Sequence, residues 1–169
     1  MRLTLSGSFL GSSTYADEDE RVIYKVRKTF KHTTASKLLS EDIPRAECGP
    51  DGDRFAHLAR IDWNLHPLIE LGGKEMEVKT FLRRVGWAKD RILTDENGKE
   101  YRWTLGARAS VLHSNDEVKT RIAKFRQGNP GGIFGEKRPA VLEIFPEGES
   151  LVDLIFVTFL FTEKQRRDG

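Results

Sequence analysis

The sequence predicts a mainly β protein, a closed barrel of about 10–12 antiparallel strands around a buried hydrophobic C-terminal helix at residues 150–166. Three observations support this fold class. Short β-prone segments alternate with turn-forming residues along most of the chain. No long amphipathic helical period interrupts them. The final apolar segment is longer than an ordinary strand and is apolar on every side, so it must be surrounded by other protein.

The composition is that of one globular domain spanning residues 1–169. Hydrophobic residues make up 38% of the chain and charged residues 32%, which excludes the disordered and membrane classes. The formal net charge is only +2, so we expect no nucleic acid among the partners. A single cysteine, Cys48, cannot form an internal disulfide, and the N-terminal segment lacks the apolar run of a signal peptide. These features favour a cytoplasmic location.

Nine candidate strands are separated by clusters of Gly, Pro, Asn and Asp, which form turns or tolerate positive φ. In chain order they cover residues 2–7, 21–30, 33–40, 55–65, 68–73, 74–82, 109–114, 120–127 and 140–145. A short helical turn is also compatible with residues 78–86. Their number and spacing indicate a barrel or a sandwich.

A β-hairpin between residues 91 and 105 is the clearest local prediction. Asn97 and Gly98 can occupy a type I′ turn that folds residues 91–95 back onto residues 99–105. In the second arm, alternate residues from Tyr101 to Leu105 are apolar, as a strand with one buried face requires.

End signals favour a helix over a strand for the last apolar segment. Ser150 and Asp153 form a variant of the capping box, and the basic residues at 164–167 lie where the negative pole of the helix would be. Twelve helical residues span about 18 Å, whereas the hydrocarbon core of a membrane is about 30 Å thick. We therefore expect a helix that is enclosed by the barrel and does not span a membrane.

This arrangement resembles the tubby C-terminal-like fold, which tubby proteins, phospholipid scramblases and plant LURP-one-related proteins share. The segments "RVIYKVRKTF", "ARIDWN" and "NGKEYRWTL", together with the end of the chain from "EKRPAVLEIF" to "EKQRR", are similar to an uncharacterised family of small basidiomycete fungal proteins. The resemblance implies a barrel around a central helix and implies no activity. Tubby domains bind phosphoinositide headgroups through basic surface residues, which makes an anionic lipid one expected partner.

The strand "YKVRKTFKH" carries the strongest candidate for an anion-binding surface. Tyr24, Val26 and Phe30 should point inward, which leaves a row of cations on the outer wall. Such cations can hold phosphates or an anionic membrane surface. The alternative is a solubilising exterior that the nearby "ADEDER" segment neutralises. The predicted headgroup site consists of Lys25, Arg27, Lys31, Arg83 and Arg84.

No motif indicates catalysis, a metal or a cofactor. The four histidines are not spaced as metal ligands, and Ser150 lacks the turn that presents a nucleophilic serine. We therefore predict a non-enzymatic binding module, peripheral at membranes, for anionic phospholipid (phosphoinositide) surfaces or for another protein.

The alternative function is a small-molecule carrier or an enzyme with a pocket at the barrel mouth. A concave pocket with converging polar side chains would favour it. The candidate polar side chains for its rim are Asp62, His57, His66 and Tyr101.

Overall fold

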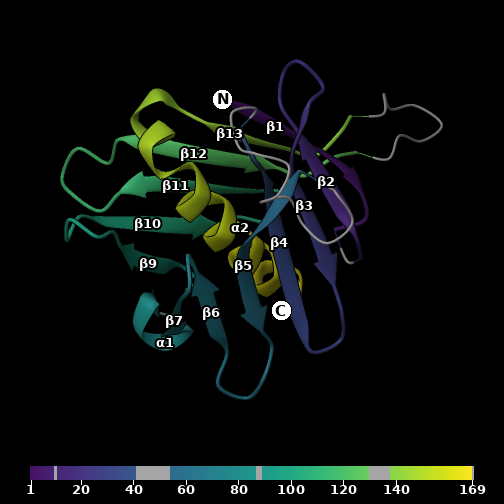
Figure 1. The fold of residues 1–169 in the computed structure, drawn as a ribbon. Helices are drawn as coiled ribbons and strands as arrows, with labels where there is room; N and C mark the ends of the chain where they lie inside the picture. The colour runs from purple at the N-terminus through teal and green to yellow at the C-terminus, as the bar shows by residue number, and fades with distance from the viewer. Residues whose placement is uncertain (10, 41–53, 87–88, 130–137, 169) are drawn as a thin grey trace.

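The fold of this computed structural model is one large antiparallel sheet wrapped around a C-terminal helix (Figure 1). The structure describes residues 1–9, 11–40, 54–86, 89–129 and 138–168. The strands are β1 (Arg2–Gly7), β2 (Ser13–Ala16), β3 (Val22–Lys28), β4 (His32–Leu38), β5 (Phe55–Asp62), β6 (Leu68–Leu71), β7 (Lys74–Glu77), β8 (Leu82–Arg84), β9 (Arg91–Thr94), β10 (Glu100–Leu105), β11 (Ala109–Ser114), β12 (Arg121–Arg126) and β13 (Val141–Ile144). The helices are α1 (Val78–Phe81) and α2 (Val152–Arg167), with a 3₁₀ helix at Pro146–Leu151.

The sheet is open, so the prediction of a closed barrel is not confirmed. Its strand order is β7-β6-β5-β4-β3-β2-β1-β13-β12-β11-β10-β9-β8, and the end strands β7 and β8 are not paired with each other in the part of the chain that is described. They are joined by the short helix α1, which forms where a helical turn was expected. Within the described residues the sheet has 13 strands rather than about 10–12, because residues 13–16 form a strand that was not predicted and residues 74–84 contain two.

The prediction of a buried C-terminal helix is confirmed. The residues of α2 from Ile155 to Glu163 are all buried, and Figure 1 shows the helix inside the curve of the sheet. Phe156 stacks on Tyr24 of β3, with ring centroids 4.0 Å apart, and Phe159 packs on Phe125 of β12 at 4.6 Å. Strands from both halves of the sheet therefore contact the helix.

The start of α2 differs from the prediction. Ser150 lies in the 3₁₀ helix and makes no capping bond, and α2 begins two residues later at Val152. Asp153, the expected partner in the capping box, instead accepts a hydrogen bond from the Tyr24 hydroxyl at 2.5 Å and pairs with Lys37 at 2.8 Å. Long-range contacts with β3 and β4 thus replace the local capping contact.

The predicted hairpin forms as β9 and β10, but its turn is not type I′. A type I′ turn needs positive φ at both central residues, and of Asn97 and Gly98 only Gly98 has it, at 80°. The Asp95 carboxylate accepts hydrogen bonds from the backbone N–H groups of Asn97 and Lys99, at 2.9 and 2.8 Å. The acidic side chain therefore shapes a longer turn.

The prediction that Phe30 points inward is wrong, because β3 ends before this residue. Tyr24 and Val26 are buried as predicted, whereas Phe30 is 98% exposed. The strand ends at Lys28, and Thr29 closes a tight loop by donating its N–H to the His32 carbonyl at 2.8 Å. Because Phe30 lies in this loop, the alternation of the strand no longer determines its direction.

One buried hydrogen bond connects the sheet to the helix and generates a stability prediction. The Trp103 indole N–H donates to the Thr158 hydroxyl at 3.1 Å. Thr158→Val would leave this N–H unpaired in the core, and we expect it to lower the free energy of unfolding by about 1–3 kcal/mol. Urea denaturation measures the change.

The matched control is Thr162→Val, because the Thr162 hydroxyl is equally buried and donates to carbonyls of its own helix. Its removal should cost less than the Thr158 change. Equal losses for the two variants would contradict a specific role for the bond to Trp103.

Candidate functional site

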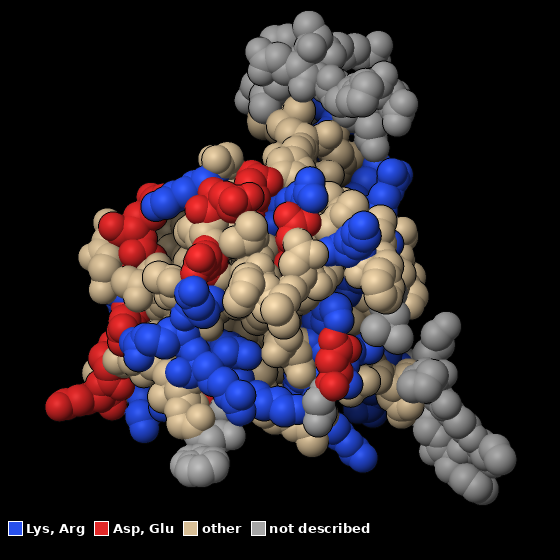
Figure 2. All heavy atoms as spheres, turned by 90° about the horizontal axis from the view of Figure 1, so that it is seen from below, with Lys and Arg blue, Asp and Glu red and all other residues tan. Residues whose placement is uncertain are grey.

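A cluster of cations surrounds the C-terminal end of α2, and we call it the basic end. Neighbouring contacts connect its members: Arg91 donates to Gln165 of α2 at 3.2 Å, and Arg84 lies opposite Arg91 in the β8–β9 pair. Figure 2, which views the molecule from below, shows Lys and Arg side chains gathered on this face. The basic end consists of Lys28, Lys31, Arg84, Arg91, Lys164, Arg166 and Arg167.

Two carboxylates lie within the basic end, and both are held by its cations. Glu163 is fully buried and accepts hydrogen bonds from Arg166 at 2.6 and 2.7 Å and from Arg167 at 2.8 Å. Asp168, just beyond α2, pairs with Lys164. A buried carboxylate without such partners would be strongly unfavourable, so these arginines are structural as well as basic.

Lys28 is a partly buried cation of the basic end. Its ammonium group lies 3.5 Å from the centroid of the Phe9 ring and donates to the Phe9 carbonyl. Burial, together with the nearby charges of Arg167 and Lys164, lowers the pKa of Lys28 to about 8. Arg167 contacts the same ring, with its guanidinium carbon 4.4 Å from the centroid.

An aromatic side chain anchors the neighbouring loops to the helix end. Trp63 stacks on Phe161 of α2, with ring centroids 5.3 Å apart and planes inclined by 14°. The ammonium group of Lys164 lies 4.9 Å from the Trp63 ring. The Trp63 backbone N–H donates to the Lys31 carbonyl at 2.8 Å, which brings the β3–β4 loop to the same place.

The structure separates the five cations that the sequence proposed as a headgroup site. Lys31 and Arg84 belong to the basic end. The other three lie on strands: Lys25 is placed over the Phe55 ring at 3.9 Å, Arg83 pairs with Glu100 at 2.8 Å, and Arg27 is exposed on β3. The outer wall of β3 and the basic end are therefore different surfaces.

Sequence reasoning missed the other members of the basic end. The cations of "EKQRR" were interpreted as ordinary residues of a helix end, and Arg91 as part of a hairpin. These cations lie near the ends of strands and of the helix, which was the one sign in the sequence that they could form a cluster. The strand order determines which loops lie at the same end of the sheet, and the sequence did not reveal that order.

A cleft of about 1250 Å³ lies at the other end of α2, across the open seam of the sheet. Residues of the β6–β7 and β9–β10 hairpins line it, together with Leu151 of the 3₁₀ helix and Leu154 of the first turn of α2. Its apolar lining also includes Leu58, Leu71 and Phe81. The cleft has the size and the mixed lining to hold an amphiphilic small molecule.

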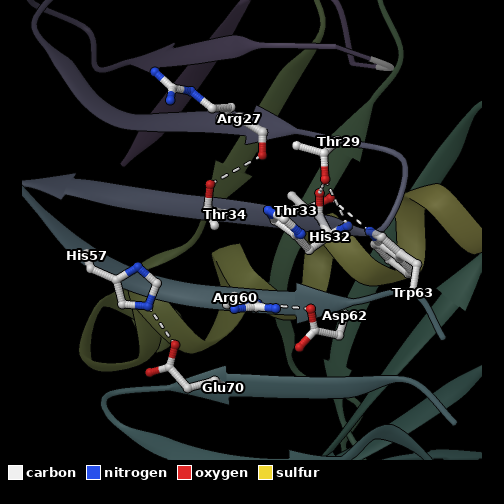
Figure 3. Close-up of polar contacts among 10 residues, drawn as sticks. All are labelled: Arg27, Thr29, His32, Thr33, Thr34, His57, Arg60, Asp62, Trp63 and Glu70. Carbon is white, nitrogen blue, oxygen red and sulfur yellow. Dashed lines mark hydrogen bonds and ion pairs between the residues drawn. The ribbon is translucent and has the colours of Figure 1, made fainter.

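The polar side chains predicted for a pocket rim do not converge on this cleft. His57 pairs with Glu70 at 2.5 Å and Asp62 with Arg60 at 2.9 Å, and Figure 3 shows both pairs on the strands β5 and β6. The Tyr101 hydroxyl donates to Asp95 at 3.2 Å, and burial together with this carboxylate raises the pKa of Tyr101. Neither these three residues nor His66 lines the cleft.

Among the described residues, no helix has both the length and the apolar character to cross a bilayer. The same residues contain no group of three or more potential metal ligands. Cys48, from which a reducing compartment was inferred, lies outside the described residues.

The comparisons with known proteins assign a family but no activity. A model of a family of unknown function, DUF6593, matches residues 10–168. No curated protein and no solved structure matches the chain. The uncharacterised nature of the family agrees with the sequence resemblance, whereas the tubby-like relationship stays a prediction.

The environment of Lys28 predicts a pH dependence of stability. Its pKa in the folded protein, about 8, lies below the ordinary value of 10.5, so between these values the unfolded chain binds a proton that the folded chain has released. Stability should therefore rise with pH across this window. Lys28→Met should remove the rise and increase the free energy of unfolding at neutral pH, by on the order of 1 kcal/mol after allowance for solvent screening.

Urea denaturation between pH 7 and 10 measures this contribution, with the exposed Lys31→Met as the control. The control should retain the slope of the wild-type protein. An identical slope in the Lys28→Met variant would contradict the assigned environment.

Proposed function

Since the chain belongs to the DUF6593 family, whose function is unknown, we propose from its own geometry that it is a non-enzymatic module that binds anionic phospholipid surfaces through the basic end. One observation carries the proposal, the concentration of seven cations around the end of α2 with two internally paired carboxylates. The predicted resemblance to tubby domains, which bind phosphoinositide headgroups, favours the same proposal.

The charge at the basic end exceeds what the fold itself requires. The C-terminal pole of a helix carries about half a negative charge, which one cation balances. The basic end has an excess of five positive charges over its carboxylates, although the formal net charge of the whole chain is +2. The rest of the chain therefore carries a net charge of −3. This separation creates a field that orients the molecule toward an anionic surface.

The magnitudes are sufficient for reversible binding. Each cation near an anionic membrane contributes about 1 kcal/mol, so an excess of five contributes at most about 5 kcal/mol. The interaction falls off within a Debye length and weakens at high salt. We therefore expect peripheral binding that depends on ionic strength.

A protein partner and a small-molecule carrier are the competing functions. The carrier would use the cleft, which lies at the other end of α2 from the basic end. Substitutions in the basic end should thus leave a carrier function intact while they weaken binding to lipid. The carrier has less support, because the predicted rim side chains do not converge on the cleft.

Charge reversal at one exposed loop residue tests the lipid proposal. Lys31→Glu changes the local charge by two, and we expect it to weaken binding by about 2 kcal/mol, roughly 30-fold. Co-sedimentation at low ionic strength, with phosphatidylcholine vesicles that contain or lack phosphatidylserine or a phosphoinositide, measures the change.

Lys119→Glu provides the matched control, because Lys119 is exposed on the β11–β12 loop, outside the basic end. It makes the same change in net charge and should bind almost as the wild-type protein does. Failure of the folded wild-type protein to bind any of the anionic vesicles would rule out the proposed function.

A further inference from the structure

Two large apolar side chains are almost fully exposed beside the basic end. Phe30, in the β3–β4 loop, is 98% exposed, and Leu65, in the β5–β6 loop, is 92% exposed. Figure 1 shows both loops at the bottom of the molecule, the side from which Figure 2 is viewed. Neither side chain packs against the core, so the stability of the fold does not explain them.

Hydrogen bonds join the two segments that carry these side chains. In the first loop, the Thr29 hydroxyl accepts the His32 N–H at 3.1 Å. Across the loops, the Trp63 backbone N–H donates to Lys31, and its indole N–H donates to the Thr33 hydroxyl at 2.9 Å. Figure 3 shows Thr29, His32, Thr33 and Trp63 close together at the base of the loops.

The helix provides the foundation for this pair of loops. Trp63 stacks on Phe161, which is buried in α2, and the Lys164 ammonium group contacts the ring of the same tryptophan. The loops that carry the exposed side chains are thus connected, through Trp63, to the buried helix α2. Because this geometry already exists, little conformational entropy is lost when the loops engage a partner.

The combination of apolar tips and flanking cations fits the interface of a bilayer. A soluble anion would contact the cations and leave Phe30 and Leu65 in water. A membrane interface accepts apolar side chains at the acyl boundary while cations remain among the headgroups. Lys31 immediately follows Phe30 in the chain, and the half-buried Trp63 belongs to a residue type enriched at such interfaces.

We propose that Phe30 and Leu65 are a two-loop membrane anchor that inserts into the acyl boundary of an anionic bilayer while the basic end contacts the headgroups. This inference rests on the proposed lipid-binding function and specifies its partner as an intact bilayer rather than a free headgroup. It also defines the orientation of the molecule, with the C-terminal end of α2 toward the membrane and the cleft away from it.

Substitution of the two side chains tests the anchor. Phe30→Ser and Leu65→Ser should each weaken binding to phosphatidylserine-containing vesicles roughly 10-fold, and the double variant roughly 100-fold. The control is Val118→Ser, because Val118 is 79% exposed on the β11–β12 loop, outside the basic end. It should bind as the wild-type protein does. Thermal unfolding monitored by circular dichroism verifies that all variants are folded.

A second measurement reports insertion directly. Phe30→Trp should show a blue-shifted emission with the same vesicles and should be quenched by lipids brominated on their acyl chains. Val118→Trp should show neither effect. Soluble inositol phosphate should displace the double Ser variant from the vesicles more effectively than it displaces the wild-type protein. The variant would retain only the charge contacts, for which the soluble anion competes.

Each other outcome overturns a distinct part of the account. Wild-type binding that is sensitive to Lys31→Glu but unchanged by the Ser substitutions would refute the anchor and leave the proposed function standing. Absence of wild-type binding to anionic vesicles would refute both. If the Ser substitutions abolish self-association of the chain and leave vesicle binding unchanged, the two loops are a protein interface and the anchor is refuted.

Discussion

The rest of the structure depends on the burial of a helix that is apolar on all sides. Apolar residues occupy consecutive positions of α2 from Ile155 to Val157 and from Phe159 to Phe161, so no single packed face can cover them. The long sheet covers this surface by curving around the helix. As a result, the middle of α2 is unavailable to partners, whereas residues near its two ends are partly exposed.

The polar residues of α2 follow from the same constraint. Thr158 and Thr162 are buried, and their hydroxyl groups donate to carbonyls of the helix itself. Asp153, near the start, is satisfied by Tyr24 and Lys37, and Glu163, near the end, by two arginines. Each of these polar side chains thus has a partner. The bonds that join Asp153 to β3 and β4 and Thr158 to Trp103 also help to define where the helix lies.

The sequence was informative about local elements and about the helix, and it was less informative about the site. Alternation correctly assigned inward faces to Tyr24 and Trp103, because both lie well inside regular strands. It failed for Phe30, where the ending of β3 and a side-chain hydrogen bond from Thr29 decide the direction. Whether the sheet closes, and whether Arg91 lies near Lys164, depends on the order of the strands in the sheet. The alternation of residues within one strand does not determine that order.

The central claim is that α2 is enclosed by the sheet and presents its C-terminal end to an anionic bilayer. Hydrogen–deuterium exchange with and without phosphatidylserine-containing vesicles tests it most directly. The account predicts that residues 155–163 are among the slowest to exchange in the free protein, and that vesicles add protection at residues 29–33, 63–67 and 164–168. Exchange of residues 155–163 as fast as the loops, or new protection confined to the β9–β10 hairpin and the cleft, would contradict it.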